Sequence, residues 1–212
     1  MKALIIGATG ATGKDLVDAL LQDPYYTEVV IFVRRPVTLT HIKLTAIVTD
    51  FDQLEAVSHD ISGDVLFSCL GTTLKVAGSK AKQRHIDFEI PLKFAQIAKT
   101  NGVSKAVLVS AYGASATSNM FYSRLKGDLE NRIADLTFNQ YFIFRPGLLL
   151  RKNTDRFGEK ISARLLKLLN GLGMLRNYRP MPTAVLAEKL AKAPKLPVGG
   201  KRVVELDEIF RF

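Results

Sequence analysis

Three glycines near the start of the chain, Gly7, Gly10 and Gly13, most constrain what it can fold into. They stand between the apolar run Ala3–Ile6 and an amphipathic segment, Lys14–Gln22. This order predicts a strand that passes through a glycine loop into a helix. Glycine suits a sharp turn that approaches an anion, and the free N–H groups at a helix N-terminus stabilise phosphate. We expect a dinucleotide site here, although the spacing departs from G-x-G-x-x-G; an ordinary tight turn is the alternative.

Short apolar runs alternate with helical patterns along the chain. The runs show little polar alternation, which is typical of strands buried on both faces of a sheet. The predicted strands are Ala3–Ile6, Val29–Val33, Leu44–Val48, Val65–Leu70, Ala106–Val109, Tyr141–Phe144 and Arg202–Leu206. The predicted helices are Lys14–Gln22, Gln53–His59, about Lys82–Thr100, about Asn119–Leu136, Gly158–Asn170 and Thr183–Lys192. The alternation predicts an α/β Rossmann-like fold, a doubly wound parallel sheet with helices on both faces.

The alternation of strands and helices ends after Pro146 and Gly147, and mostly helical segments with turn signals follow. We therefore expect a single domain over residues 1–212. It has a Rossmann core at 1–147 and a small C-terminal substrate lobe at 148–212, from which a strand near 202–206 returns. Residues 145–212 hold 15 of the 30 Lys and Arg residues but only 6 of the 20 Asp and Glu residues. A solvated surface is the favoured interpretation of this charge, and binding to nucleic acid or an anionic membrane surface is the weaker alternative.

Composition favours an intracellular protein. The single cysteine, Cys69, excludes an internal disulfide framework and fits a reducing compartment. No secretory signal pattern is visible, and no apolar stretch is long enough for a membrane span. We expect a cytoplasmic protein without specific nucleic-acid recognition. The histidines at 41, 59 and 85 show no metal-ligand spacing, so no metal site is predicted.

A Tyr–Lys pair and a serine are the candidate chemical groups. Tyr122 has Lys126 four residues later, within a predicted helix that places both on one face. A nearby ammonium favours the phenolate, which would let Tyr122 exchange a proton with a carbonyl or alcohol oxygen. Ser110 follows the run Ala106–Val109, at the carboxyl end of a strand, where ligands bind in open parallel sheets.

In this order, after a nucleotide-type loop, these residues resemble the short-chain dehydrogenase/reductase superfamily. The resemblance implies that Ser110 polarises the substrate oxygen, that Tyr122 is the acid/base, and that Lys126 tunes Tyr122 and holds the nicotinamide ribose. The glycine spacing resembles the atypical branch, nearest the Tat-interacting-protein-like oxidoreductases. So do the residues 69–73 (CLGTT), the stretch Val109–Gly127 and the tripeptide 145–147 (RPG).

One departure from the superfamily pattern concerns the proton relay. Many members carry an asparagine in the fourth helix that supports a water chain to the active-site lysine, and the matching position here is Asp87. A carboxylate there could hold a water, could pair with a cation and change the lysine pKa, or could impair the relay.

Cofactor preference is indicated at the end of the second strand. Arg34 and Arg35 follow it and no acid is near, which favours the 2′-phosphate of NADP(H) over the ribose hydroxyl of NAD(H). By the resemblance, Asp50 and Phe51 approach the adenine. Residue patterns and resemblance together place the cofactor contacts at Gly7, Thr9, Gly10, Ala11, Thr12, Gly13, Arg34, Arg35, Asp50, Phe51, Cys69, Leu70, Gly71, Thr72, Tyr122, Lys126, Arg145 and Pro146.

The sequence therefore predicts an NADP(H)-dependent oxidoreductase that transfers a hydride between nicotinamide and a carbonyl or alcohol. The alternative is a binding module whose NADP(H) occupancy controls contact with a protein partner, with little or no turnover. The expected partners are the nucleotide and a small-molecule substrate, and the chain is expected to be a monomer or a homodimer.

Overall fold

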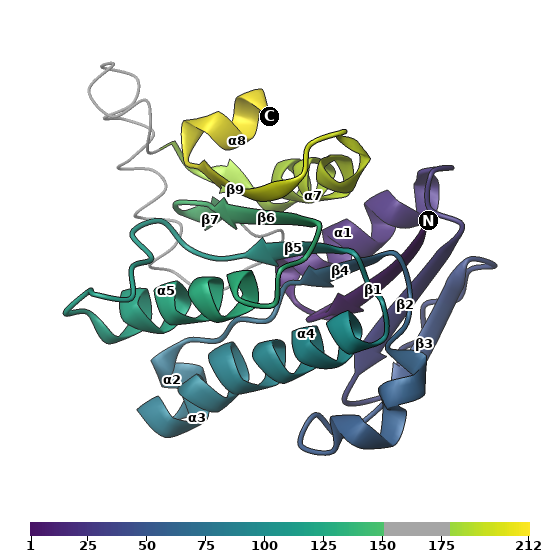
Figure 1. Ribbon diagram of the computed structural model, residues 1–212, viewed down its shortest axis with the longest axis horizontal. Coiled ribbons are helices and arrows are strands. Elements are labelled where there is room, and N and C mark those ends of the chain that lie inside the picture. The colour runs from purple at the N-terminus through teal and green to yellow at the C-terminus, as the bar shows by residue number, and fades with distance from the viewer. Residues whose placement is uncertain (151–178) are drawn as a thin grey trace.

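A seven-stranded parallel sheet forms the centre of the computed structural model, which describes residues 1–150 and 179–212. The strand order is β3-β2-β1-β4-β5-β6-β9 (Figure 1). The strands are β1 (Lys2–Ile6), β2 (Glu28–Val33), β3 (Leu44–Val48), β4 (Val65–Ser68), β5 (Lys105–Val109), β6 (Gln140–Arg145) and β9 (Gly200–Glu205). Two short strands, β7 (Leu149–Leu150) and β8 (Met181–Pro182), pair separately. The predicted doubly wound α/β fold is confirmed.

Helices cover both faces of this sheet. The α-helices are α1 (Ala11–Gln22), α2 (Leu74–Ala77), α3 (Lys80–Arg84), α4 (Ile90–Thr100), α5 (Phe121–Ala134), α7 (Thr183–Lys192) and α8 (Asp207–Arg211). The shorter helical turns are η1 (Leu54–Asp60), η2 (His85–Glu89) and η4 (Ala193–Lys195). One apolar core lies between the sheet and α1 with α7, and the other lies between the sheet and α4 with α5 (Figure 1).

The helix predicted from about Lys82 is longer and less regular than expected. It begins at Lys80 and consists of α3, the π-helical turn η2 and α4 in direct succession. Pro91 gives the physical reason. A proline in a helix has no N–H for the carbonyl four residues earlier, here that of Asp87, and its ring crowds that carbonyl. The wider π turn accommodates this defect and carries Asp87.

Burial on both faces was the wrong expectation for β3. Thr45, Ala46 and Val48 are exposed because β3 is the last strand of the sheet. Strand β4 ends at Ser68, so Cys69 and Leu70 belong to the loop that follows it. The helix predicted at Gly158–Asn170 lies outside the described residues.

The described C-terminal residues pack onto the α/β core formed by the preceding strands and helices. Strand β9 extends the sheet beside β6, and α7 packs along α1. The buried Tyr26 hydroxyl, in the loop after α1, donates to the carbonyl of Ala191 at 2.7 Å. No helix in residues 1–150 and 179–212 is long and apolar enough to cross a membrane.

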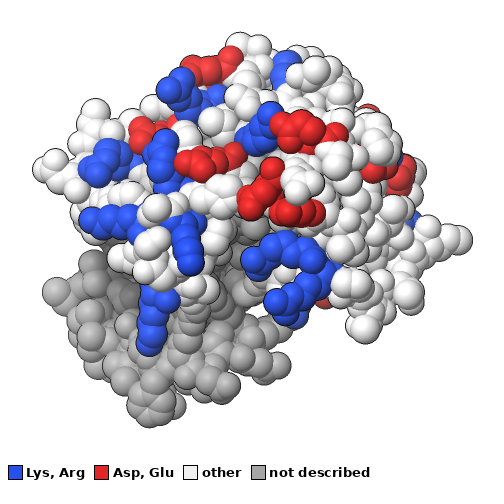
Figure 2. All heavy atoms as spheres, turned by 90° about the horizontal axis from the view of Figure 1, so that it is seen from below, with Lys and Arg blue, Asp and Glu red and all other residues white. Residues whose placement is uncertain are grey.

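Positive and negative side chains are interspersed on the face shown in Figure 2. Some cations of the C-terminal segment are paired with acidic side chains. Arg179 contacts Asp207 at 2.9 Å, and Lys195 contacts Asp23. Seven of the 15 cations at 145–212 lie at 151–178, outside the described residues. The described cations of this basic segment therefore include paired ones, and the solvated-surface interpretation stays a prediction.

Candidate active site

Two of the three loop glycines are required by close packing. Gly7 has φ +81°, and a Cβ on it would lie 2.6 Å from the backbone carbon of Cys69. A Cβ on Gly13 would lie 2.1 Å from the carbonyl oxygen of Gly7. Gly10 is less confined, with its nearest such contact at 3.2 Å. The packing holds the start of α1 against β1 and the loop after β4, and it leaves backbone accessible at Gly10.

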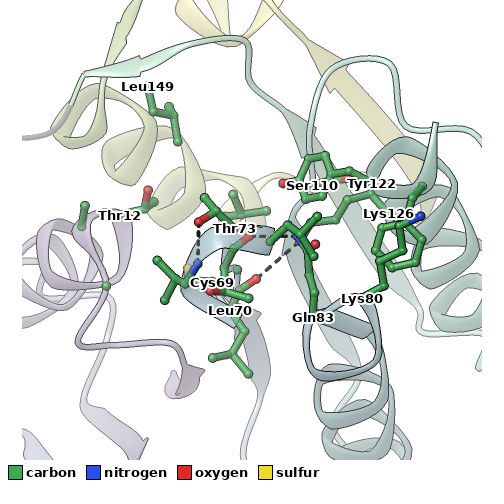
Figure 3. Close-up of a pocket in the computed structure, with 18 residues that line it drawn as sticks. Thr12, Cys69, Leu70, Thr73, Lys80, Gln83, Ser110, Tyr122, Lys126 and Leu149 are labelled. Atoms are coloured by element: carbon green, nitrogen blue, oxygen red, sulfur yellow. Dashed lines mark hydrogen bonds between the residues drawn. The ribbon is translucent and has the colours of Figure 1, made fainter. Parts of the chain in front are cut away.

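A cleft of about 640 Å³ opens at the carboxyl ends of β1, β4 and β5. Residues from the first turn of α1, from the loop after β4 and from α5 line it. The predicted site residues among its lining are Gly10, Ala11, Thr12, Cys69, Leu70, Gly71, Thr72, Ser110, Tyr122 and Lys126. Figure 3 shows Thr12 at one end and Ser110, Tyr122 and Lys126 together at the other.

Three other predicted cofactor contacts do not line this cleft. Arg34 and Arg35 are exposed after β2. Thr9 lines a second hollow, of about 430 Å³, together with residues 36–39 and Lys14, a cation that the sequence analysis did not assign. Its signal was its place directly after Gly13, at the start of α1.

Four further predicted contacts, at positions 50, 51, 145 and 146, are also absent from the lining of the main cleft. Phe51 lines a third hollow, of about 330 Å³, and packs against the core, while Asp50 before it is exposed. Neither Arg145 nor Pro146 is among the described residues that line the main cleft. The Pro146 carbonyl instead accepts a hydrogen bond from the Tyr112 backbone N–H at 3.0 Å.

Helix α5 presents the Tyr–Lys pair to the cleft. Tyr122 is 39% exposed, whereas Lys126 is 2% exposed and its Nζ donates to the Leu70 carbonyl at 3.4 Å. Burial lowers the pKa of Lys126, and the carboxylates of Asp87 and Glu130 oppose that effect. A Cβ on Gly71 would lie 3.9 Å from this ammonium, so the loop after β4 passes beside it.

Ser110 makes a contact that the sequence analysis missed. Its buried Oγ donates a hydrogen bond to Oε1 of Glu130, which is 4% exposed. Arg145 donates to the same carboxylate through Nε at 3.0 Å and Nη2 at 2.5 Å. The signal for Glu130 was available, because it follows Lys126 by four residues and so extends the face of α5 that Tyr122 begins.

The Arg145 guanidinium belongs to a carboxylate network. Besides Glu130, it reaches Glu205 of β9 through Nη1 at 2.6 Å. These two partners, Glu130 first, raise the pKa of Arg145. The network joins α5, β6 and β9, and it accounts for Arg145 without any ligand; the predicted cofactor contact stays a prediction.

Asp87 is fully buried beside the lysine. Its Oδ1 accepts the Thr72 backbone N–H at 2.8 Å, and its Oδ2 has no hydrogen-bond partner among the described residues. Burial raises the pKa of Asp87, and the charge of Lys126 opposes that rise. The Oδ2 left unpartnered by the described residues fits a held water and the nearby ammonium fits pairing with a cation, so the alternatives for this position stay predictions.

Neither the Cys69 thiol nor His85 has the surroundings of a reactive or metal-binding group. Burial raises the pKa of the Cys69 thiol to about 12, which disfavours the nucleophilic thiolate. His85 bridges Asp52 at 2.6 Å and Glu89 at 3.0 Å. Within residues 1–150 and 179–212, no three His, Cys, Asp or Glu residues are grouped as metal ligands.

The fold and the site are those of a dinucleotide-binding protein. They combine a parallel doubly wound sheet, a glycine loop that leads into α1, and a cleft lined by serine, tyrosine and lysine. Residues 7–163 match the NAD(P)H-binding family, and the chain belongs to that family.

Within the short-chain dehydrogenase/reductase superfamily, the chain belongs to the atypical branch, as predicted. It is 33% identical over 172 residues to the mitochondrial protein FMP52 of Eremothecium gossypii, covering 80% of this chain and 77% of that protein. It is 35% identical over 150 residues to protein HTATIP2 of Rattus norvegicus, covering 69% of this chain and 62% of that protein.

Solved structures share the fold at low sequence identity. MoeE5 in complex with UDP-glucuronic acid and NAD superposes with a TM-score of 0.74 at 16% identity, covering 97% of this chain and 76% of that one. UDP-glucose 4-epimerase of Thermotoga maritima, with UDP-glucose, gives 0.72 at 13% identity, covering 100% and 81%. These likenesses support the architecture alone.

The expectation of a cytoplasmic protein is wrong as an inference from this sequence. The FMP52 relatives of Eremothecium gossypii and Saccharomyces cerevisiae are named mitochondrial proteins, the latter 31% identical over 172 residues, covering 78% of this chain and 74% of that protein. Composition and cysteine content do not distinguish a cytoplasmic from a mitochondrial protein, because targeting depends on signal residues and not on the residues that build the fold.

Proposed function

We propose that this protein is an NADP(H)-dependent oxidoreductase that acts on a carbonyl or alcohol through Ser110, Tyr122 and Lys126. One observation carries the proposal: the start of α1 and these three side chains line the same cleft. Membership of an NAD(P)H-binding family supports the nucleotide half of it. The chemical half rests on residue types and their placement.

The residues present fit such a nucleotide. At Gly10 the absence of a side chain leaves the backbone open next to the N-terminus of a twelve-residue helix, where phosphate is stabilised. The contacts would come from Gly10–Thr12 and Leu70–Thr72, with Lys126 at the ribose. When bound, the nicotinamide supplies or accepts a hydride.

The side chains at the other end of the cleft handle the proton. Tyr122, which is partly exposed to the cleft, gives its phenolic proton to the carbonyl oxygen during reduction and takes it back during oxidation. The buried ammonium of Lys126 stabilises the phenolate that this transfer leaves. Ser110 positions the substrate oxygen from the end of β5.

A preference for NADP(H) rests on charge at the end of β2. Arg34 and Arg35 are exposed there, and no acid occurs between Glu28 and Asp50. Lys14 lines the neighbouring hollow and adds a third cation. A guanidinium pairs with a 2′-phosphate by charge-assisted hydrogen bonds, whereas NAD(H) offers only a hydroxyl.

Calorimetric titration and turnover assays test both halves of this function. Wild-type protein should bind NADPH more tightly than NADH, and Arg34→Ala or Arg35→Ala should lose about one to two decades of NADPH affinity. Equal affinity of the wild type for both nucleotides would contradict the NADP(H) preference.

Tyr122→Phe should keep NADPH affinity and lose about 10² to 10⁴ in turnover, while Lys126→Ala loses both. Full activity of Tyr122→Phe would contradict the mechanism.

The second candidate is a binding module with little or no turnover. The Ser110 contact favours it, because a hydroxyl that donates to Glu130 has no proton left for a substrate oxygen. This function predicts that NADPH binds while no carbonyl or alcohol in a broad panel is turned over, and that NADPH changes affinity for a protein partner.

A further inference from the structure

We propose that the substrate carries an alkyl or aryl group on its carbonyl carbon, and that apolar side chains of α2 and α5 bind this group. The inference rests on the proposed function and names its substrate class. It excludes hydroxyl-rich carbonyls and the nucleotide sugars that are bound in some structures sharing the fold.

Helix α2 holds two large apolar residues exposed beside the cleft. Leu74 is 46% exposed and Val76 is 65% exposed, and both line the cleft. The helix is short and fixed at both ends. The Thr73 hydroxyl oxygen accepts the Val76 N–H at 3.3 Å, and Gly78 closes the helix with φ +82°. An apolar surface held open to solvent in this way is favourable to cover with an apolar ligand group.

Apolar side chains also flank the reacting groups. Phe121 directly precedes Tyr122 at the start of α5, and Val109 directly precedes Ser110 at the end of β5. Both line the cleft. A substrate whose oxygen meets Tyr122 therefore presents the rest of its structure to an apolar surface that begins next to the phenol.

Two polar side chains of the same cleft, Gln83 and Thr73, are engaged with the protein. Gln83 donates through Nε2 to the Thr72 carbonyl at 3.2 Å, and the Thr73 hydroxyl caps α2. The Lys80 ammonium lies 5.6 Å from the centre of the Phe121 ring (Figure 3 labels the lysine). No Asp or Glu occurs among the described residues that line the cleft. The hydroxyl groups of a substrate that carries many of them would be left without hydrogen-bond partners, which costs binding free energy.

A homologous series of aldehydes tests the inference. With NADPH, kcat/KM should rise by about fourfold for each methylene from propanal to heptanal, the value expected for burying one methylene. Benzaldehyde should be accepted, and glyceraldehyde should be poorer than propanal. Leu74→Asn and Val76→Asn should flatten this rise. Lys75→Asn is the matched control, because Lys75 is on α2 but does not line the cleft, and it should keep the rise.

A binding readout separates this inference from the proposed function. Alkyl amides of the same chain lengths carry a carbonyl that is not reduced, and their affinity for the NADPH-loaded protein can be followed by cofactor fluorescence. Affinity that rises with chain length supports the inference even if no aldehyde is turned over, a result that would remove only the hydride transfer. A flat amide series, or preferred binding of glyceraldehyde or UDP-glucose, would overturn the inference.

Discussion

At the residue scale, the electrostatics of the cleft depend on Lys126. Burial lowers the pKa of this lysine, and two carboxylates keep its ammonium favourable. Glu130 shares its charge with the Arg145 guanidinium and the Ser110 hydroxyl. Asp87 has one oxygen without a hydrogen-bond partner in the described part of the chain, so its charge is the less compensated of the two. Asp87 is therefore the carboxylate best placed to hold the lysine in its charged form.

We predict that Asp87→Asn shifts the alkaline limb of the kcat/KM profile to lower pH. Removal of the carboxylate takes away an interaction that raises the lysine pKa, so Lys126 loses its proton at lower pH and activity falls earlier as pH rises. Asp128→Asn, on the same helix as Lys126 and outside the cleft lining, should leave the limb in place. Identical profiles for wild type and Asp87→Asn would exclude this role.

At the element scale, close backbone approaches position the cleft. Helix α5 packs onto the loop before it at Gly127, where a Cβ would lie 2.3 Å from the backbone nitrogen of Ala116. This contact holds α5, which carries Tyr122 and Lys126, against residues 115 and 116 of that loop. The π turn η2, which accommodates Pro91, positions Asp87.

Gly127→Ala should therefore destabilise the protein by about 3 kcal/mol, although alanine is the better helix former by about 1 kcal/mol. The clash is with backbone atoms, which do not swing aside as a side chain would. Thermal and urea unfolding measure the loss. Gly71→Ala is the control, because its Cβ would have no neighbour nearer than 3.9 Å and no positive φ is needed. Equal stability of Gly127→Ala and wild type would contradict this packing.

At the scale of the whole molecule, the seven parallel strands and most helices could be predicted from the sequence. Buried parallel strands are short runs of β-branched and aromatic residues, and Ala106–Val109 and Tyr141–Phe144 are examples. The edge position of β3 could not be predicted, because strand order is a tertiary property that period and composition do not encode.

The site was predictable where spacing within one element defines it, as for Tyr122 and Lys126 on α5. The Glu130–Arg145–Glu205 network was not, because it joins three elements that only the folded chain brings together. The same holds for the orphan oxygen of Asp87, which follows from a π turn and complete burial.

The central claim is hydride transfer, and the most direct measurement is transfer of label. NADPH carrying deuterium on the transferable position of the nicotinamide C4 is incubated with the protein and heptanal, and the alcohol is analysed by mass spectrometry. We predict an alcohol one mass unit heavier than the product from unlabelled NADPH, bearing deuterium on its carbinol carbon, at a rate that Tyr122→Phe reduces by about 10² to 10⁴. Tight NADPH binding with no deuterium above background in the alcohol from any aldehyde or ketone tried would contradict the account and leave the binding module.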